Sequence, residues 1–571
     1  MITLNDLGHE EPTGDQRQPT EVSLRPDASG YISGYFKPLG FNKDEKGVQA
    51  FHFFVKGSNT IIRLTSSQFS KLNLIMLAPL DFWEYAFAKD KGSWDNVKAA
   101  DFLCRLCNHR GIFQEDMIRG RGAWLEDDNV VIHTGKTLII GGEECGLGEK
   151  PTKYIYELGK DLDIDVSNPL TGKEAEQLTS ILTTINWEGA SDGELLAGWL
   201  AIAPLCGVLP WRPHIWITGG TGTGKSWTFD NIVRKMIDNI SISVQGNSSE
   251  AGIRQALGKD ALNCLFDEAE GETEYRQQQM QNVMGLMRSS SASNGAQLLK
   301  GSASGQAKSS YVRGCFAFAS IVPQMEHGSD FRRITLFELK KMRSQSAFLA
   351  LDRKRVETIT DEFAKRFQAR MILNMANILQ SIEICTNAVA NHSKNRALGD
   401  QIGGMLAGYW HISQDDVISF EDAQILAEEV VADQMSKSTG QRESDEQRCL
   451  QHLLSAEVKI DGEYFGTLTV GELIECCVEV GATIPAKEAN KRLRRLGIMV
   501  DHDKNTGDDW LFILNTSSWV HERLKKTAWT SSHRTVLGRL EGAQAYRKNK
   551  YYSAGVQGSG LMIPIKNIIQ S

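Results

Sequence analysis

The sequence has no excess of positive charge. Its 571 residues carry a formal net charge of −8 at pH 7, and the sequence pI is about 5.9. A strongly basic chain would have indicated a nucleic-acid partner directly. DNA remains open as a partner, because a local basic stripe, and not the total charge, decides that kind of binding.

A long uninterrupted apolar segment is also missing. The longest apolar run covers residues 195–211, and two glycines and two prolines interrupt it. A helix that spans a bilayer needs about 20 consecutive apolar residues. Residues 1–17 are polar and contain no apolar core of a signal peptide. We therefore expect no membrane association and a cytoplasmic location.

The cysteines follow no regular spacing. There are ten of them, and most, such as Cys264 and Cys315, have apolar neighbours, which is typical of reduced thiols in the core of a cytoplasmic protein. The 41% hydrophobic and 23% charged content is that of an ordinary soluble globular chain. Its length is enough for three or four domains.

Composition and pattern divide the chain into six regions. We expect a flexible lead-in over 1–27, an α+β domain over 28–165, an α/β core over 166–345, a helical region over 346–436, a linker over 437–446 and a basic winged-helix-like domain over 447–571. Within the core, short apolar strands are predicted over 214–218, 261–266, 315–320 and 334–339. Such strands, alternating with helices, indicate a parallel sheet that is covered on both faces. Further helices are predicted over 355–390, 400–409 and 420–435.

A glycine-rich loop follows the first of these core strands. It reads Gly219-Gly220-Thr221-Gly222-Thr223-Gly224-Lys225-Ser226, with Trp227 next. This fits the pattern G-x-x-x-x-G-K-[ST], and the strand before it and the helix expected over 225–236 supply the required context. Successive backbone N–H groups can then hold the phosphates of ATP, and we expect residues 219–227, Trp227 included, to bind the nucleotide. We expect Lys225 to contact the β- and γ-phosphates and Ser226 to bind Mg²⁺. The alternative is a glycine-rich turn that arose by chance.

Two acids end the next predicted strand. Asp267 and Glu268 follow the apolar residues 262–266, and we expect their strand to lie beside the phosphate-loop strand and to deliver both acids to the same crevice. Asp267 is then a second Mg²⁺ ligand, and Glu268 is the general base for the attacking water. The alternative is a solvated acidic strand end, because Glu270 and Glu272 follow.

Two further features come later in the core. Ser320 ends the third predicted strand, and Arg332 and Arg333 directly precede the fourth. Packing does not require an arginine pair there. At a subunit boundary one of them, Arg333 before Arg332, can act as an arginine finger that stabilises charge on a neighbour's γ-phosphate. The alternative is a surface arginine in a loop.

Together these motifs resemble the ATPase module of AAA+ superfamily 3-type helicases, and more narrowly the helicase half of phage and plasmid primase-helicases. The resemblance covers about residues 191–339, and Arg119-Gly-Arg-Gly-Ala-Trp124 is similar to the domain that precedes the ATPase in such prophage proteins. It implies an ATP-hydrolysing AAA+ P-loop core in a hexameric ring that moves along single-stranded or forked DNA. It also implies a mobile-element replication system in a bacterial host cell.

Two departures from that family stand out. Ser320 occupies the position where the resemblance implies a γ-phosphate sensor that is usually asparagine, and a simple strand cap is the equal alternative. Paired metal-binding carboxylates of a primase are not found upstream of the phosphate loop. We therefore expect any primase to be a separate chain.

Basic residues at three places are candidate DNA contacts. Lys300 and Lys308 are the charged residues of a serine- and glycine-rich loop at the position of the family's pore hairpin. In the C-terminal region, Lys491 and Arg494 lie on one face of a predicted helix, and Arg547 and Lys548 have tyrosines nearby. The alternatives are a plain surface loop and solvated basic segments.

Two other functions use the same motifs. One is an AAA+ regulatory or protein-remodelling ATPase, for example in phage defence or replisome loading. The loop around Lys300 has no aromatic residue before Tyr311, which favours DNA over protein. The other is an initiator that uses ATP only to assemble, and Glu268 argues against it, because such a switch does not need a catalytic base.

Overall fold

The computed structural model describes most of the chain. The described residues are 23–43, 47–89, 93–127, 129–246, 248–267, 269, 273–292, 298–301, 307–325, 328–441, 445–460, 466–478, 484–503, 507–525, 527, 529–530, 532–553 and 556–568. Side chains of 274, 298–310, 435–445, 547–556 and 567 lie outside this description. Two compact units are present: one comprises Met1–Gln324 and Arg333–Val431, and the other comprises Met325–Arg332 and Ala432–Ser571.

The first unit begins with two antiparallel sheets. One contains β1 (Phe36–Lys43), β2 (Gln49–Val55) and β3 (Thr60–Thr65), with α1 (Lys71–Leu74), α2 (Leu80–Ala86), the strand pair β4 (Ala88–Lys89) and β5 (Ser93–Trp94), and α3 (Asn96–Arg110). The other has the order β10-β9-β8-β7, formed by β7 (Gly122–Glu126), β8 (Asn129–His133), β9 (Thr137–Ile140) and β10 (Glu143–Gly146). The short strands β6 (Ile118–Arg119) and β11 (Ile155–Tyr156) pair in parallel. These elements combine antiparallel strands with helices.

The segment 119–124 attaches these sheets to the core. The Arg121 guanidinium donates from Nε and Nη2 to the Asp260 carboxylate at 3.0 and 2.5 Å. Gly122 has φ +109°, and a Cβ there would lie 2.2 Å from the Ala261 carbonyl oxygen. Glycine is therefore required where the two backbones meet.

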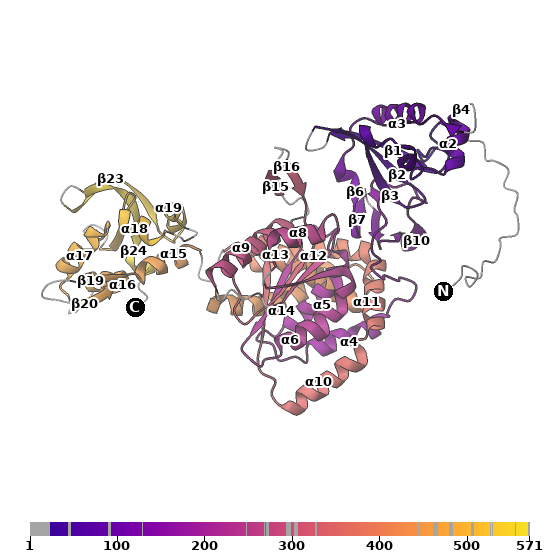
Figure 1. Cartoon of the computed structure of the whole chain (residues 1–571). Coiled ribbons are helices and arrows are strands. Elements are labelled where there is room, and N and C mark those ends of the chain that lie inside the picture. The colour runs from indigo at the N-terminus through magenta and orange to yellow at the C-terminus, as the bar shows by residue number, and fades with distance from the viewer. Residues whose placement is uncertain are drawn as a thin grey trace, which may run out of the picture. The chain divides into compact units, whose positions relative to one another are not determined.

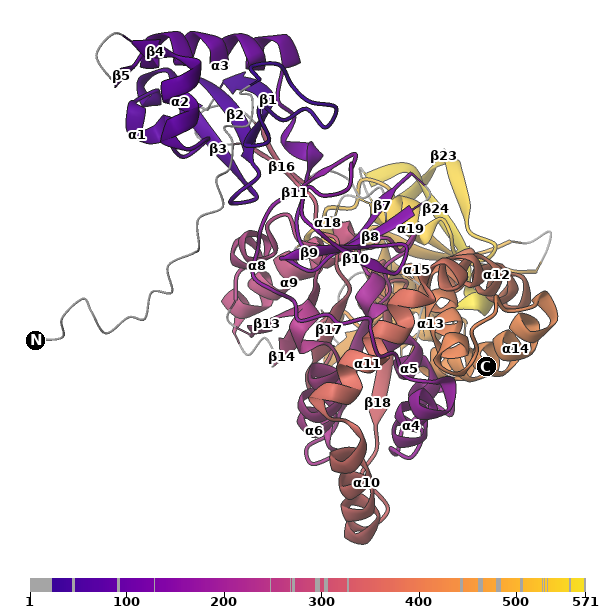
Figure 2. The same ribbon diagram turned by 90° about the vertical axis from the view of Figure 1, so that its right-hand side faces the viewer.

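A five-stranded parallel sheet forms the core of this unit. Its strands are β12 (His214–Gly219), β13 (Ser241–Gln245), β14 (Asn263–Asp267), β17 (Phe316–Ala319) and β18 (Ile334–Leu339), in the order β13-β14-β17-β12-β18. Helices surround the sheet in both views (Figures 1 and 2). The mixed α/β fold with a parallel sheet agrees with the sequence prediction.

The buried strands pack by aromatic rings. Trp216, Phe318 and Phe266 share one row across β12, β17 and β14, with ring centroids 4.8 Å apart for the first two and 5.8 Å apart for the last two. The four strands predicted from sequence are those with continuous apolar runs. β13 was missed because it alternates polar and apolar residues, as expected for a half-exposed edge strand.

Helices complete the first unit. They are α4 (Gly172–Leu182), α5 (Asp192–Ile202), α6 (Lys225–Thr228), a π-helical segment (Phe229–Arg234), α7 (Lys235–Ile237), α8 (Glu250–Leu257), α9 (Glu274–Ser290), α10 (Gln345–Thr358), α11 (Asp361–Leu373), α12 (Met375–Ser393) and α13 (Arg396–Ser413), followed by α14 (Phe420–Gln441). The helical stretch predicted over 355–390 is divided in the structure. The structure has three helices there, and the first begins at Gln345, because Ser344 accepts a capping hydrogen bond from the Ala347 N–H. α10 extends away from the sheet in both views (Figures 1 and 2).

The second unit has its own core. Its elements are α15 (Asp445–Leu454), β19 (Glu457–Ile460), β20 (Gly466–Thr469), α16 (Val470–Val478), α17 (Ala486–Arg495), β21 (Ile498–His502), β22 (Asp509–Leu514), α18 (Ser518–Arg523), α19 (His533–Leu537), β23 (Gln544–Ser553) and β24 (Val556–Pro564). In the polar stretch 437–446 that was predicted as a linker, α14 continues to Gln441 and α15 begins at Asp445. Across the described residues, the structure contains no helix that is long and apolar enough to span a membrane.

Candidate functional site

The glycine-rich loop connects β12 to α6. Gly219, Gly222 and Gly224 have φ values of +148°, +78° and +96°, which side-chain-bearing residues rarely adopt. A Cβ on Gly219 would also lie 2.6 Å from the Leu339 carbonyl oxygen. Lys225 is the first residue of α6, so the loop ends at a helix N-terminus. The arrangement is that of a backbone cradle for an anion.

Asp267 and Ser320 lie at the same edge of the sheet as this loop. All five strands are parallel, so their carboxyl ends meet there. The prediction that the Asp267 strand lies beside β12 is wrong, because β17 lies between them. Asp267 is therefore about 10 Å, or two strand spacings, from β12. Ser320 stands between them at the end of β17.

The Ser320 hydroxyl is already engaged in this structure. It accepts a hydrogen bond from the Trp216 indole at 2.8 Å and donates to the Val322 carbonyl oxygen at 3.0 Å. The residue is 3% exposed. To donate to a phosphate, the hydroxyl must give up its bond to Val322. These two contacts are those of a strand cap, and the sensor role requires the hydroxyl to turn away from Val322.

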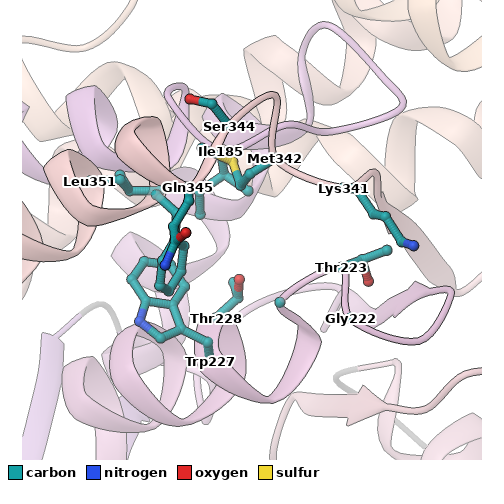
Figure 3. A pocket seen from close by; sticks show the side chains of 12 residues that line it. Ile185, Gly222, Thr223, Trp227, Thr228, Lys341, Met342, Ser344, Gln345 and Leu351 are labelled. Atoms are coloured by element: carbon teal, nitrogen blue, oxygen red, sulfur yellow. The ribbon is translucent and has the colours of Figure 1, made fainter.

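A pocket of about 470 Å³ adjoins the loop (Figure 3). Its lining residues are Ile185, Gly222, Thr223, Gly224, Trp227, Thr228, Lys341, Met342, Ser344, Gln345, Phe348 and Leu351. Figure 3 shows Trp227, Gln345 and Leu351 on one side and Thr223 and Lys341 on the other. The volume and the mainly apolar walls suit a small organic ligand.

Trp227 is held in place within this pocket. Its indole N–H donates to the Asp352 carboxylate at 3.0 Å, and its ring lies edge-on to Phe348 with a centroid distance of 5.3 Å. The indole hydrogen bond helps to lower the pKa of Asp352, although the Arg355 hydrogen bond is the larger cause. The sequence predicts that Trp227 binds nucleotide. It does not predict that Ile185 and residues 341–351 form the other wall of this pocket. The only local signal there is the helix cap at Ser344.

The two arginines directly precede β18, at the amino ends of the parallel strands. This side of the sheet is opposite to the side that carries the glycine-rich loop. β18 pairs with β12 from Ile334 opposite His214 to Leu339 opposite Gly219, a distance of roughly 17 Å along the strand. Arg333 lies over the Trp211 ring at 5.7 Å, and Arg332 is exposed. The structure therefore does not bring Arg333 to the phosphate loop of its own chain.

For five of the predicted site residues, the side chain lies outside the described part of the structure. Glu268 lies outside the described residues. Lys300 and Lys308 occupy directly paired positions of the hairpin formed by β15 (Leu298–Gly301) and β16 (Ala307–Ser310), and their side chains lie outside the description. The side chains of Arg547 and Lys548 in β23 do so as well.

The helix α17 carries the other predicted DNA contacts. Lys491 and Arg494 are both on it, and Lys491 is largely exposed and 3.6 Å from the Glu488 carboxylate. Arg492 forms a shorter ion pair with the same carboxylate at 2.6 Å. The acid therefore neutralises part of the basic face of this helix.

Comparison with known proteins gives remote structural likenesses. No family model matches the sequence, and no curated protein matches it. A solved structure described as "SCCmec type IV Cch - active helicase" is 10% identical, covers 96% of this chain and 98% of its own, and has a TM-score of 0.49. The apo structure of the NrS-1 C-terminal region, also 10% identical, covers 76% of this chain and 95% of its own with a TM-score of 0.29.

Proposed function

We propose that this chain is an ATP-dependent DNA helicase or translocase that works as an oligomeric ring. The observation that carries the ATPase part is the cradle of positive-φ glycines at the carboxyl edge of a parallel sheet, next to a 470 Å³ pocket. In open α/β sheets, ligands bind at the carboxyl ends of the strands. The usual place is beside the strand at which the chain changes from building one half of the sheet to building the other. β12 is that strand, because the chain runs from it to the far edge strand β13 and later returns to β18 on its other side.

The residues around the cradle fit ATP with Mg²⁺. The loop N–H groups and Lys225 hold the phosphates, and the pocket beside Trp227 holds the base. Ser226 and Asp267 offer the hydroxyl and carboxylate oxygens that Mg²⁺ prefers. When bound, Mg²⁺ neutralises charge that develops on the phosphates. Glu268, next to Asp267 in the chain, accepts a proton from the attacking water.

The position of Arg333 supports a ring. Arg333 is at the amino ends of the strands, whereas the phosphate loop is at their carboxyl ends. Arg333 therefore reaches a γ-phosphate only on a neighbouring subunit. Arg332 is the second candidate for this role. A closed ring, with a hexamer as our proposal, places each nucleotide between two subunits.

The proposed partner is single-stranded or forked DNA. Like charges at directly opposed positions weaken a hairpin. Lys300 and Lys308 are paired in this way, and a DNA phosphate bound between them would remove their repulsion. The second unit contains, in order, α15, the strand pair β19–β20, α16, α17 and the hairpin β21–β22. This order supports our proposal of a winged-helix-like domain in which α17, with Lys491 and Arg494, contacts DNA. We propose a replication role in a mobile element of a bacterial cell, with any primase on a separate chain.

Single-stranded DNA is expected to stimulate ATP hydrolysis by the purified protein several-fold. The reason is that a translocase couples each hydrolysis cycle to contacts with the strand. The measurement is phosphate release with and without an oligothymidylate, and the control is Glu268→Gln, which removes the proposed base. Hydrolysis that is indifferent to DNA argues against a DNA motor and favours the alternative of a regulatory or protein-remodelling ATPase.

Replacing Trp227 by alanine is expected to raise the KM for ATP about tenfold, because one ring–base contact contributes about 1–3 kcal/mol. The kcat should change less, since we propose that the ring contacts the base and not the transferred phosphate. Trp227→Phe keeps a ring but loses the hydrogen bond to Asp352, so its KM should stay near that of the wild type. Equal increases for both variants would assign the effect to the Asp352 bond, and unchanged KM values would remove the base from this pocket.

A further inference from the structure

Five side chains form an alternating row of aromatic rings and arginines, which we name the arginine–aromatic ladder. Its members are, in order, Tyr311, Arg313, Trp124, Arg119 and Tyr154. The Arg313 guanidinium carbon is 5.6 Å from the Tyr311 centroid and 5.4 Å from that of Trp124. The Arg119 guanidinium carbon is 5.0 Å from Trp124 and 3.8 Å from Tyr154. Each arginine therefore lies between two rings.

The ladder lies at the base of the β15–β16 hairpin. Tyr311 and Arg313 directly follow β16, and the segment that contains them continues into β17. Arg119 belongs to β6 and Trp124 to β7, in the sheets that precede the core. Figure 1 shows the hairpin projecting from the core. The ladder therefore joins three parts of the first unit at the base of the hairpin.

The charge of the ladder is not balanced by acids. Among the described residues, no ion pair with a carboxylate is formed by Arg119 or Arg313, and the hydrogen bonds found for Arg119 go to the carbonyl oxygens of Asp116 and Ile118. Burial lowers the pKa of Arg313 to about 10, and the like charges of Arg212 and Arg119 lower it further. Only two tyrosines act in the other direction.

Three other buried or half-buried arginines of the first unit have acid partners. Arg121 pairs with Asp260, Arg355 with Asp352, and Arg370 with Asp415. A buried or half-buried cation normally needs such a partner. Arg212 has no acid partner but donates to four carbonyl oxygens. Among the described residues, no acceptor is found for the Arg313 guanidinium, which marks a place for an external anion.

We propose that the ladder binds single-stranded DNA, with the guanidinium edges holding backbone phosphates and the Tyr311 ring stacking a base. Tyr311 is 37% exposed at the end of the row, and aromatic rings beside arginines are the usual means of binding a strand without sequence preference. The rings hold both guanidinium groups in place. Arg119 uses Nη1 for the Asp116 and Ile118 carbonyl oxygens, so Arg313 and the other N–H groups of Arg119 are those we assign to phosphate. This inference rests on the proposed function, because it names where the strand is held.

The ladder and the proposed nucleotide site share one short segment of the chain. Arg313 and Ser320 are at its two ends, with β17 between them.

The test is the affinity for a fluorescent oligothymidylate, measured by anisotropy over a range of salt concentrations. Arg313→Gln, Arg119→Gln and Tyr311→Ala are each expected to weaken binding about tenfold, in line with one lost stack or phosphate contact. Each arginine variant should also reduce the slope of log K against log salt by about 0.7. Tyr311→Phe keeps the ring and should bind like the wild type.

The matched control is Arg105→Gln on α3. It removes the same charge from the same unit, but its side chain is 79% exposed and paired with Asp101. Equal weakening by this control would assign the effect to net charge and overturn the proposal, as would unchanged affinity in Tyr311→Ala. Thermal unfolding of each variant shows whether the fold persists, and Tyr311, being exposed, gives a variant that does not depend on core packing.

Two further measurements distinguish a DNA site from a simple anion site, and a failure of this inference from a failure of the proposed function. Inorganic phosphate at an equal phosphate concentration should not displace the oligothymidylate; full displacement would make the ladder a simple anion site and overturn the DNA assignment. If DNA stimulates wild-type hydrolysis but the ladder variants bind normally, this inference fails and the proposed function stands. If DNA neither binds nor stimulates the wild type, the proposed function fails as well.

Discussion

Replacing Lys225 by alanine is expected to lower kcat/KM for ATP hydrolysis by about 10²–10³, the usual loss when one charge-stabilising donor is removed from a reaction site. Lys225 follows Gly224, whose φ of +96° turns the chain into α6. The helical backbone continues without interruption through the π-helical segment into α7. The lysine stem therefore starts from a fixed point at the mouth of the proposed phosphate cradle.

Phosphate release under saturating and limiting ATP measures this effect. Lys225→Arg keeps the charge but replaces a compact ammonium by a planar fork, so we expect it to recover little activity. The matched control is Lys235→Ala, which removes an equally charged lysine from α7 on the same helical segment, where it pairs with Asp361 at 3.0 Å. Activity above half of the wild-type value in Lys225→Ala would show that hydrolysis takes place elsewhere.

Replacing Arg212 by methionine is expected to lower the free energy of unfolding of the core by about 4 kcal/mol, because hydrogen bonds to a buried charged group contribute about 1.5–3 kcal/mol each and are only partly replaced. Arg212 is 1% exposed. Its guanidinium donates to the carbonyl oxygens of Cys206 at 2.6 Å and of Gly207, Ser290 and Ala292 at 3.0 Å. It thus connects the loop before β12 to the end of α9.

The neighbouring His214 indicates how dry this region is. Burial, followed by the charges of Arg212 and Arg333, lowers the pKa of His214 to about 3. The Phe316 N–H donates to its Nδ1, so the neutral ring carries its proton on Nε2, which faces the Ser291 hydroxyl at 3.0 Å. Water therefore cannot readily replace the lost guanidinium, and the four carbonyl groups would remain without that donor.

Urea unfolding followed by tryptophan fluorescence measures the loss, with the core transition analysed separately from that of the second unit. Arg212→Lys should be intermediate, because one ammonium cannot reach all four carbonyl oxygens. The control Arg396→Gln removes an exposed arginine that pairs with Asp400, and we expect a change within about 0.5 kcal/mol. An unfolding midpoint for Arg212→Met equal to that of the control would contradict the anchoring role.

The predictions that came directly from sequence concern features encoded within a few consecutive residues. The loop from Gly219 to Ser226 needs glycines at fixed places and a strand and a helix on either side, and all of these are adjacent in the chain. The buried strands were visible because continuous apolar runs cannot face water. Parallel pairing followed from the alternation of such strands with helices, and the structure agrees.

Features that depend on which distant segments meet were decided only by the tertiary structure. The insertion of β17 between β14 and β12, the pocket wall formed by Ile185 with residues 341–351, and the place of Arg333 at the amino ends of the strands are of this kind. The ladder joins Arg119, Trp124 and Tyr154 to Tyr311 and Arg313, which come much later in the chain. Local periodicity and turn chemistry carry no information on such pairings, because these arise from the burial of whole faces against each other once the chain has closed.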